Sequence, residues 1–462
     1  MGRLSQLTAA ATLGVAVLGV AVPAAVRANG AFPDAQSILT PVDRPGQIIM
    51  ATNFGVISSS DAGATWLWSC ETEGNAYGTL YQIAPLPRDR LFTVANLALA
   101  YSDDGTCSWQ TARGALAELP VTDAYVDPKD ANHVLAIGAP GSLYSLFEST
   151  DGGATFGSPL YTAPADTAIQ GVEIAQSDPL TIYMSMTSPT AAPLLARSTD
   201  GGAHFTVSDL SADLGPGWLR IIAVDPQDPA RVLLRFLGIN DQSLALTTDG
   251  GVSASKPVTI TGNFTSFARL PSGTMLVGAM AQGGAVPTLF RSRYSWSSFE
   301  TLPSAPSIRA LSQRDGIVYA AADNFGDGFA LGTSADEGET WRALLRYNQV
   351  QGILPCLRSR CLPDCQARAD IGLWPQAVCG AAVTGDGGVD GGGGGRPPAS
   401  GCGCGVTARQ SRDPGAVALV FVAVLAAIAA AARRASRASG CSRSSSASAS
   451  PARRHRTGRS PG

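Results

Sequence analysis

Ser149-Thr150-Asp151-Gly152-Gly153-Ala154-Thr155-Phe156 is the stretch that decides the fold, because the chain repeats it. Its pattern, Ser/Thr-x-Asp-x-Gly-x-Thr/Ser-aromatic, occurs seven times at intervals of 42 to 49 residues. A period in the forties with a turn and an aromatic residue at a fixed phase is typical of a β-propeller. Each unit is one four-stranded blade, which buries its apolar faces only by stacking in a ring. The other copies begin at Ser59, Ser102, Ser198, Thr247, Ser292 and Ser334.

The composition of the repeat predicts a structural turn and not a catalytic group. Asp and Ser/Thr side chains accept hydrogen bonds from backbone groups two residues on, which holds a turn in place. The repeated glycine supplies a positive φ at no steric cost, and the closing Trp or Phe buries its ring for about 2 to 3 kcal/mol. We therefore assign the repeat carboxylates to turns, namely Asp61, Asp104, Asp151, Asp200, Asp249 and Asp336.

The segments between the repeats have the character of short strands. Apolar runs such as Ala124–Val126 and Ile222–Val224 lead into Asp-Pro turns, and β-type runs recur with turn residues every 8 to 12 positions. The sequence thus predicts an all-β fold, a single propeller of seven four-stranded blades. Six and eight blades are the alternatives, because the copy at Ser292 has Tyr294 in place of Asp and Trp296 in place of Gly.

The repeat resembles the Asp-box, or BNR repeat, of sialidases and many unrelated propellers. The resemblance covers roughly Ser37 to Arg346. In that family the box is a turn element outside the active site, so the resemblance implies a fold and leaves the function open. A sialidase would be expected to carry an Arg-Ile-Pro segment, three arginines for the substrate carboxylate and a Tyr–Glu nucleophile pair. No Arg-Ile-Pro occurs here, Asp43-Arg44-Pro45 in its place lies in a predicted turn, and sialidase propellers have six blades.

The two ends of the chain carry targeting features. Arg3, an apolar run from Leu7 to Val22, and small residues at the minus-three and minus-one positions (Val26 and Ala28) predict a secretory signal peptide over 1–28, cleaved after Ala28 and followed by the propeller over 29–350. A Gly-rich linker is expected over 381–414, a transmembrane helix over 415–434, and a basic Ser/Arg-rich cytoplasmic tail over 435–462. The whole chain has a net charge of −3, and the eight arginines from residue 415 onward contribute +8 to it. The rest of the chain therefore has a net charge of −11. This acidic balance excludes nucleic acid as an expected partner.

A second resemblance concerns the C-terminal region. Gly401-Cys402-Gly403-Cys404-Gly405, a spacer, an apolar helix and an arginine cluster are similar to the MYXO-CTERM sorting tails of myxobacterial surface proteins. The resemblance implies that an envelope sorting protease removes the helix and that Cys402 or Cys404 is modified for anchoring. The extension from Ser436 to Gly462 is longer than such tails usually carry. The alternative is a permanent membrane anchor, and both interpretations tether the propeller to the cell envelope.

Six further cysteines are candidates for disulfides in an exported chain. Four of them crowd into 351–380, which predicts a small stapled cap with three possible connectivities; the spacing lacks the paired Cys-x-x-Cys of a zinc site. Cys70 and Cys107 lie at similar heights on adjacent blades, so a bridge between them is expected. The four in the cap are Cys356, Cys361, Cys365 and Cys379.

No catalytic constellation emerges from the sequence. The two histidines within the propeller, His133 and His204, fall in turns and leave no base for a Ser or Cys nucleophile; no metal cluster or phosphate loop is found, and no cofactor is expected. Propellers bind ligands at the channel mouth, where the innermost strands converge. The charged candidates there are Glu173, Arg220 and Arg309. Tyr81, Tyr125 and Trp218 are expected in exposed loops, where they would add stacking surface for a glycan or peptide.

The sequence therefore favours an exported, envelope-anchored propeller that acts as a non-enzymatic recognition or scaffolding module for a glycan or surface protein. The first alternative is a sialidase-like glycoside hydrolase acting on extracellular glycans. It requires two carboxylates or an arginine cluster that converge on the channel from separate blades. The second is an assembly factor like the Asp-box propellers that help to build photosynthetic complexes, which rests on fold analogy.

Overall fold

The computed structural model describes residues 33–380, apart from 71–79, 240, 261, 281–287, 294, 295, 297 and 304. The chain separates into two compact units, Met1–Asp386 and Gly387–Gly462, and all described residues belong to the first. The predicted signal peptide, Gly-rich linker, membrane helix, basic tail and the sorting residues Cys402 and Cys404 lie outside the described residues. Within the described part of the chain, no helix is long and apolar enough to cross a membrane.

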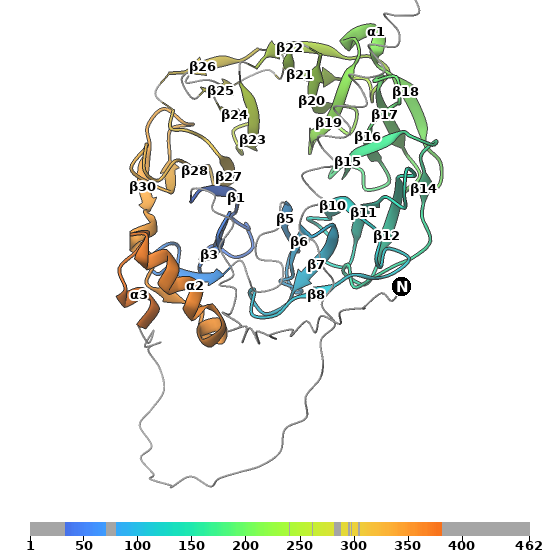
Figure 1. Cartoon of the computed structure of the whole chain (residues 1–462). Helices are drawn as coiled ribbons and strands as arrows, with labels where there is room; N and C mark the ends of the chain where they lie inside the picture. Colours follow the sequence, from blue (N-terminus) through green and yellow to red (C-terminus); the bar gives the residue numbers. More distant parts are fainter. Residues whose placement is uncertain are drawn as a thin grey trace, which may run out of the picture. The chain divides into compact units, whose positions relative to one another are not determined.

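Seven antiparallel sheets stand around a ring and form a seven-bladed propeller (Figure 1). The strands of each blade follow one another in sequence order, with the first strand innermost. Blade 1 contains β1 (Ala35–Leu39), β2 (Ile48–Thr52), β3 (Gly55–Ser59) and β4 (Leu67–Cys70); blade 2 contains β5 (Leu80–Ile83), β6 (Leu91–Ala95), β7 (Ala98–Ser102) and β8 (Gln110–Thr111). Blade 3 contains β10 (Val121–Val126), β11 (Val134–Gly138), β12 (Ser145–Ser149) and β14 (Tyr161–Thr162); blade 4 contains β15 (Ala168–Ile174), β16 (Ile182–Thr187), β17 (Pro193–Ser198) and β18 (Thr206–Asp209).

The remaining three blades repeat the same order. Blade 5 contains β19 (Gly217–Val224), β20 (Val232–Gly238), β21 (Gln242–Thr247) and β22 (Ser255–Thr259). Blade 6 contains β23 (Asn263–Arg269), β24 (Met275–Met280), β25 (Thr288–Ser292) and β26 (Glu300–Leu302). Blade 7 contains β27 (Ala310–Arg314), β28 (Ile317–Ala321), β29 (Leu331–Ser334) and β30 (Arg342–Leu345). Two short strands, β9 (Arg113–Gly114) and β13 (Thr155–Phe156), pair in parallel, and a short helix, α1 (Ser211–Leu214), precedes blade 5.

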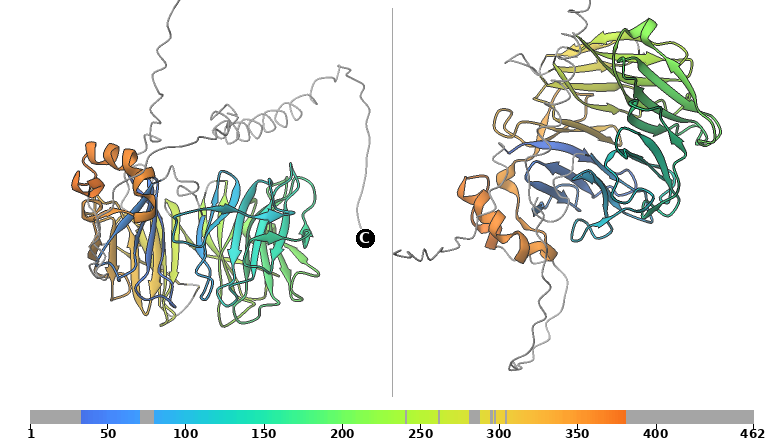
Figure 2. Two further views of the ribbon diagram at one scale, coloured as in Figure 1. Left: turned by 90° about the horizontal axis from the view of Figure 1, so that it is seen from below. Right: turned by 45° about the vertical axis from the view of Figure 1, so that its right-hand side comes forward.

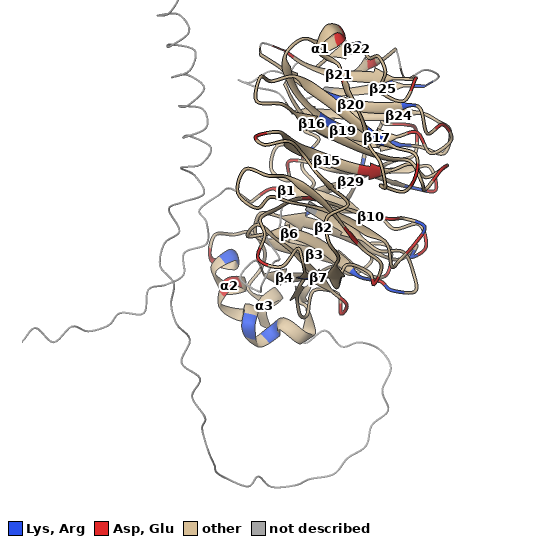
Figure 3. Cartoon of the chain, turned by 90° about the vertical axis from the view of Figure 1, so that its right-hand side faces the viewer, with Lys and Arg blue, Asp and Glu red and all other residues tan. Residues whose placement is uncertain are grey.

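The apolar core lies between neighbouring blades. The middle strands are buried on both faces and are therefore nearly continuous apolar runs; all residues of β11 and β16 are buried. Tyr183 of blade 4 packs in one cluster with Leu219 and Leu234 of blade 5. Each fully buried side chain of this kind contributes roughly 1.5 to 3 kcal/mol, so the stacked blades supply the stability that one blade lacks. In Figure 3 most of the strand ribbon is tan, and much of the charge lies in the connecting loops.

The first four strands of blade 1 and the four strands of blade 7 each come from one continuous stretch of chain, so neither blade borrows one of these strands from the other. The closure is made by residues 347–380, here called the C-terminal strap. The strap contains η1 (Tyr347–Gln349), β31 (Gly352–Ile353), η2 (Pro355–Leu357), α2 (Arg358–Asp370) and α3 (Ala377–Gly380). Strand β31 pairs in parallel with β4 and adds a fifth strand to blade 1. Figure 2 shows the strap, in orange, beside the blue strands of blade 1.

Aromatic side chains of the strap complete the core at this seam. The ring of Tyr347 lies 5.1 Å from that of Phe54, and the ring of Trp374 lies 5.1 Å from that of Trp68. The same cluster includes Leu331 of blade 7. The strap therefore joins the first and last blades by burying apolar surface from both.

The disulfides differ from the expected pairing. Cys70 bonds to Cys361 and Cys107 bonds to Cys356, so no bridge joins Cys70 to Cys107. Within the strap, Cys365 bonds to Cys379, and the expectation of a cap stapled only to itself is wrong. The physical reason is that β31 lies along the outer edge of blade 1. This pairing brings the strap cysteines to the ends of blades 1 and 2, an arrangement that cysteine spacing alone does not reveal.

Candidate functional site

The octapeptide turns are closed hydrogen-bonded units. In the turn at Ser149, the Ser149 hydroxyl donates to Asp151 Oδ1 (2.7 Å) and accepts from the Gly153 N–H (2.9 Å). The Thr155 N–H and hydroxyl donate to the two oxygens of Asp151, at 2.9 and 2.6 Å. The turns that begin at Ser59, Ser102, Ser198, Thr247 and Ser334 have equivalent bonds between the Asp and the residue four positions later.

These bonds set the protonation state of the turn carboxylates. Hydrogen bonds from Thr340 lower the pKa of Asp336 to about 2. Burial alone would raise the pKa of Asp151, but the bonds from Thr155 and Ser149 outweigh it and lower the pKa to about 2. A carboxylate held ionised in this way is a poor general acid, and its oxygens already accept hydrogen bonds. The turns therefore hold the fold and offer no free group for chemistry.

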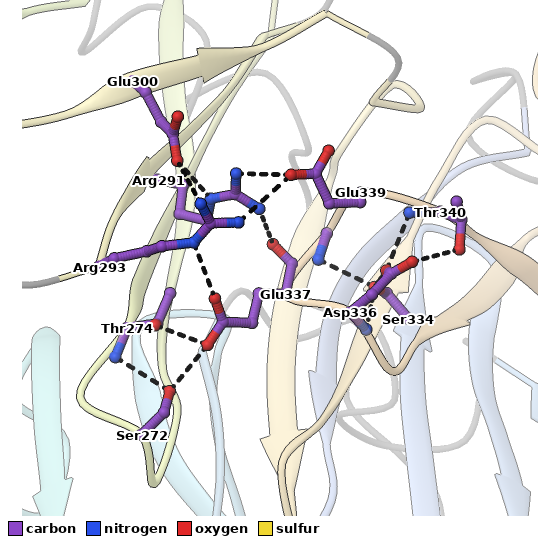
Figure 4. A network of polar contacts seen from close by, with 11 residues as sticks. Ser272, Thr274, Arg291, Arg293, Glu300, Ser334, Asp336, Glu337, Glu339 and Thr340 are labelled. Carbon is purple, nitrogen blue, oxygen red and sulfur yellow. Dashed lines mark hydrogen bonds and ion pairs between the residues drawn. The ribbon is translucent and has the colours of Figure 1, made fainter.

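A larger polar network joins blades 6 and 7 beside the last turn (Figure 4). Arg291, whose side chain is 2% exposed, donates to Glu300 (2.7 Å), to Glu339 (2.6 Å) and to the carbonyl oxygen of Glu337 (3.3 Å). Arg293 donates to the carboxylates of Glu337 (3.2 Å) and Glu339 (3.3 Å). Because every charge in the network has an opposite partner, it acts as a tie between two blades and not as a ligand site.

Charged side chains from three blades meet at a cavity on the inner strands. The cavity has a volume of about 420 Å³, lies against β5, β10, β15 and β19, and is here called the inner cavity. Asp123 of blade 3, Glu173 of blade 4 and Arg220 of blade 5 line it. Arg220 Nη2 lies 3.1 Å from Asp123 Oδ1, while Asp123 Oδ2 accepts from the Val172 N–H at 3.2 Å. Two of the residues that the sequence indicated, Glu173 and Arg220, are thus brought together.

Inner-strand side chains also bind the backbone of the next blade. Glu173 Oε1 accepts from the Val224 N–H at 3.0 Å, and Gln82 Oε1 accepts from the Val126 N–H at 2.7 Å. Strands β10 and β19 are the innermost strands of their blades and have no neighbouring strand on the channel side, which leaves backbone groups unpaired within the sheet. These side chains satisfy such groups, so part of the polar character of the cavity wall has a structural cause.

The two carboxyl groups of the cavity differ in environment. Burial raises the pKa of Glu173 to about 8; the hydrogen bond from the Val224 N–H opposes this shift and the nearby charge of Asp123 supports it. Burial also raises the pKa of Asp123, although the charge of Arg220 opposes that shift. Glu173 therefore carries a proton at neutral pH, whereas Asp123 is engaged in an ion pair. A protonated carboxyl can donate a hydrogen bond to a ligand.

A second cavity of about 370 Å³ adjoins the first, with which it shares Arg220, Ile221 and Ile222. Arg235 and Phe264 complete one side of it, and the guanidinium of Arg235 lies 5.6 Å from the centre of the Phe264 ring. Arg235 Nε donates to Gln242 Oε1 at 2.7 Å. Among the described residues, Arg235 forms no ion pair with a carboxylate. Burial and then the charge of Arg220 lower the pKa of Arg235.

Of the other residues that the sequence indicated, Tyr125 also lines the inner cavity, and the rest lie elsewhere. Arg309 pairs with Asp34, with Nε 2.9 Å from Oδ2, and it is not among the residues that line either cavity. The exposed aromatic residues were expected in loops, but all three lie in strands. Tyr81 is buried in β5 and Tyr125 is half-buried in β10, where its hydroxyl donates to the Ile174 carbonyl oxygen (3.3 Å). Trp218 alone of the three is exposed, at 45%.

Sequence reasoning missed Asp123 and Arg235. Both lie in strands beside apolar neighbours, where a charged residue is unusual. A charged residue within a strand could have marked both as candidates. It does not reveal that Arg220 and Arg235 stand directly opposite each other. In the described part of the chain, no group of three or more His, Cys, Asp or Glu side chains is arranged to hold a metal ion.

Comparisons with known proteins agree with a propeller and go no further. No family model and no curated protein matches the sequence. A GH74 enzyme from Niastella koreensis is 15% identical with a TM-score of 0.50, and the match covers 68% of this chain and 54% of that chain. Hydrazine synthase from Kuenenia stuttgartiensis is 11% identical with a TM-score of 0.49, and the match covers 68% of this chain and 98% of that chain. YCF48 bound to a D1 peptide is 19% identical with a TM-score of 0.36, and the match covers 49% of this chain and 67% of that chain. This chain thus spans about half the length of the Niastella enzyme, and likeness at such identities shows the fold alone.

Proposed function

We propose that this propeller is a non-enzymatic recognition module that binds a glycan or protein ligand at its inner-strand cavities. The observation that carries the proposal is the convergence of Asp123, Glu173 and Arg220 from three separate blades on one open cavity. Arg220 is 49% exposed in its side chain, and Glu173 holds a proton that it can donate. Together these groups offer both donors and acceptors to a polar ligand.

A glycoside hydrolase is the second candidate, and one observation favours it. A carboxyl with a pKa of about 8 beside a second carboxyl matches the acid half of a glycosidase pair. Asp123 would have to be the nucleophile or base of that pair. It is poorly suited to this role, because it is 6% exposed and both of its oxygens accept hydrogen bonds from protein donors. A nucleophile or base must reach the substrate, which the burial of Asp123 hinders, so recognition without turnover is the better account.

The placement of the module is also a proposal. The apolar N-terminal run and the tail from Gly401 onward support an exported protein that is tethered at the cell envelope, either by a membrane helix or by a modified cysteine after an envelope protease has acted. Fractionation of cells followed by protease treatment of intact cells tests it. Recovery in the membrane fraction with cleavage from outside supports the proposal, and a protected soluble chain contradicts it.

The experiment that tests recognition uses the full-length purified chain on a glycan array and a peptide array, with hydrolysis of sialosides and aryl glycosides measured in parallel. Binding without turnover, weakened in Arg220→Gln, is the expected result. Turnover that is lost in Glu173→Gln would establish the hydrolase instead. The matched control is Arg342→Gln, which removes an exposed arginine from the outer strand of blade 7.

A further inference from the structure

One sheet face of blade 5 combines exposed apolar side chains with two arginines. In the register of β19 and β20, Trp218 stands opposite Leu237 and Arg220 stands opposite Arg235. Residues two apart on a strand share a face, so these four side chains lie on one face. Ile239 follows at the end of β20. We call Trp218, Arg220, Arg235, Leu237 and Ile239 the blade-5 patch.

On the opposite face of the same strands, the apolar side chains are buried, as is usual in a propeller blade. Leu219 and Phe236 are 0% and 1% exposed, and they pack against blade 4. Trp218, Leu237 and Ile239 are 45%, 41% and 78% exposed. Cross-strand apolar pairs normally stabilise a sheet by being covered. This pair is left open at one end of the blade, next to the second cavity.

The paired arginines are unfavourable for the fold itself. Like charges directly opposite on neighbouring strands destabilise a sheet. Arg220 is compensated by Asp123, but Arg235 forms no ion pair with a carboxylate among the described residues and stands over the ring of Phe264. A ligand carboxylate that binds Arg235 would remove this repulsion. The cost to the sheet is therefore an indication that an anion binds here.

The charge and chemistry of the patch narrow the class of ligand. Because Arg220 is paired with Asp123, the remaining positive charge of the patch is that of Arg235, which matches one carboxylate. Beside it, Leu237 and Ile239 offer aliphatic surface without polar groups. Sugar hydroxyls placed over that surface would lose their hydrogen bonds, whereas aliphatic or aromatic side chains of a protein would be buried favourably.

We propose that the blade-5 patch binds an extended segment of a partner protein in which an acidic residue stands beside an apolar one. The carboxylate binds Arg235, and the apolar side chain packs on Trp218 and Leu237. Exposed tryptophan and arginine are the residue types that dominate binding energy at protein interfaces. This inference rests on the proposed recognition function and names its ligand.

The test measures binding of N-acetylated, C-amidated hexapeptides that carry one Asp or Glu beside Leu, Phe or Trp. Analogues with Asn or Gln in place of the acid are measured in parallel on the full-length chain. We expect the acidic peptides to bind about tenfold more tightly than their amide analogues. Arg235→Gln should abolish this preference, and Trp218→Ala should weaken both peptide sets about tenfold.

Two variants serve as controls. Val252→Ala removes an exposed apolar side chain from the octapeptide turn at the other end of blade 5, and Arg342→Gln removes an exposed arginine from blade 7. Both should leave peptide affinity unchanged. Because Trp218→Ala and Arg235→Gln act on different parts of the patch, each tests the inference even if the other fails to fold.

Three results would overturn the inference. They are equal affinity for acidic and amide peptides, an acid preference that survives Arg235→Gln, and no peptide binding. In the last case, binding on the glycan array would leave the recognition function intact and refute only the peptide ligand. Absence of both glycan and peptide binding would refute the recognition function as well.

Discussion

The octapeptide turns and the inner wall of blades 3 to 5 use the same residue types in opposite ways. In the turn at Asp151, the carboxylate is ionised and accepts four hydrogen bonds from Ser149, Ala154 and Thr155. On the inner wall, Glu173 is protonated at neutral pH, and Arg235 forms no ion pair among the described residues. The comparison teaches that the polar residues of the repeated turns build the fold, while Arg220 and Arg235 on the inner strands keep charge that is available to bind.

The largest expected loss of stability comes from the disulfides at the seam between blades 7 and 1. It tests whether the octapeptide turns and the inner strands belong to one cooperatively folded ring. Serine at all four cysteines of the two long-range bridges should lower the free energy of unfolding by more than about 5 kcal/mol, because those bridges span 291 and 249 residues. Denaturant unfolding measures the change. The four cysteines are Cys70, Cys107, Cys356 and Cys361.

The matched control replaces Cys365 and Cys379, whose bridge spans only 14 residues. Its removal should cost about 3 kcal/mol. If the two variants lose the same stability, the strap does not close the ring in the way described.

The next effect is expected in the turns. Asp151→Asn should lower the free energy of unfolding by about 2 kcal/mol at pH 7, because an amide nitrogen replaces an oxygen that accepts hydrogen bonds. Affinity for the acidic peptides should not change. Thermal and denaturant unfolding measure the loss. Glu118→Gln is the control, since Glu118 is exposed and makes no hydrogen bond or ion pair within the described residues.

The carboxyl groups of Asp151 in its turn and Glu173 on the inner strand should make the free energy of unfolding change with pH in opposite directions. The lowered pKa of Asp151 contributes stability that is present above the unfolded pKa near 3.8 and is lost as pH falls towards 2. The raised pKa of Glu173 contributes stability that is present below the unfolded pKa near 4.5 and is lost as pH rises through about 8.

The Glu173 contribution can be isolated by mutation. Between pH 5 and 8 the unfolding free energy of the wild type should fall relative to that of Glu173→Gln, by at most about 1.4 kcal/mol per pH unit. Denaturant midpoints measured across this range provide the test. Parallel curves for the two proteins would show that Glu173 is ionised throughout.

The smallest effect is expected for Arg235. Arg235→Gln should change the free energy of unfolding by about 0.5 kcal/mol or less, because relief of repulsion from Arg220 offsets the lost hydrogen bond to Gln242. Denaturant unfolding checks it. A loss above about 2 kcal/mol would make Arg235 a structural residue.

The fold was predictable because a repeated turn such as Ser149–Phe156 is local, and its chemistry is complete within eight residues. Glu173 and Arg220 were predictable as charged residues on inner strands. The pairing of Cys70 with Cys361 was not, since it depends on where β31 lies after the ring has closed. Nor was the opposition of Arg220 and Arg235, because register between strands is set by packing and turn geometry, not by composition.

The most direct test of the account measures peptide affinity and unfolding free energy together on Asp151→Asn and Arg235→Gln. The account predicts that Asp151→Asn loses stability and keeps acid-dependent peptide binding, while Arg235→Gln keeps stability and loses that binding. If each variant loses both properties, or if their effects are reversed, then the division between repeated residues that build the fold and unrepeated residues that bind is wrong.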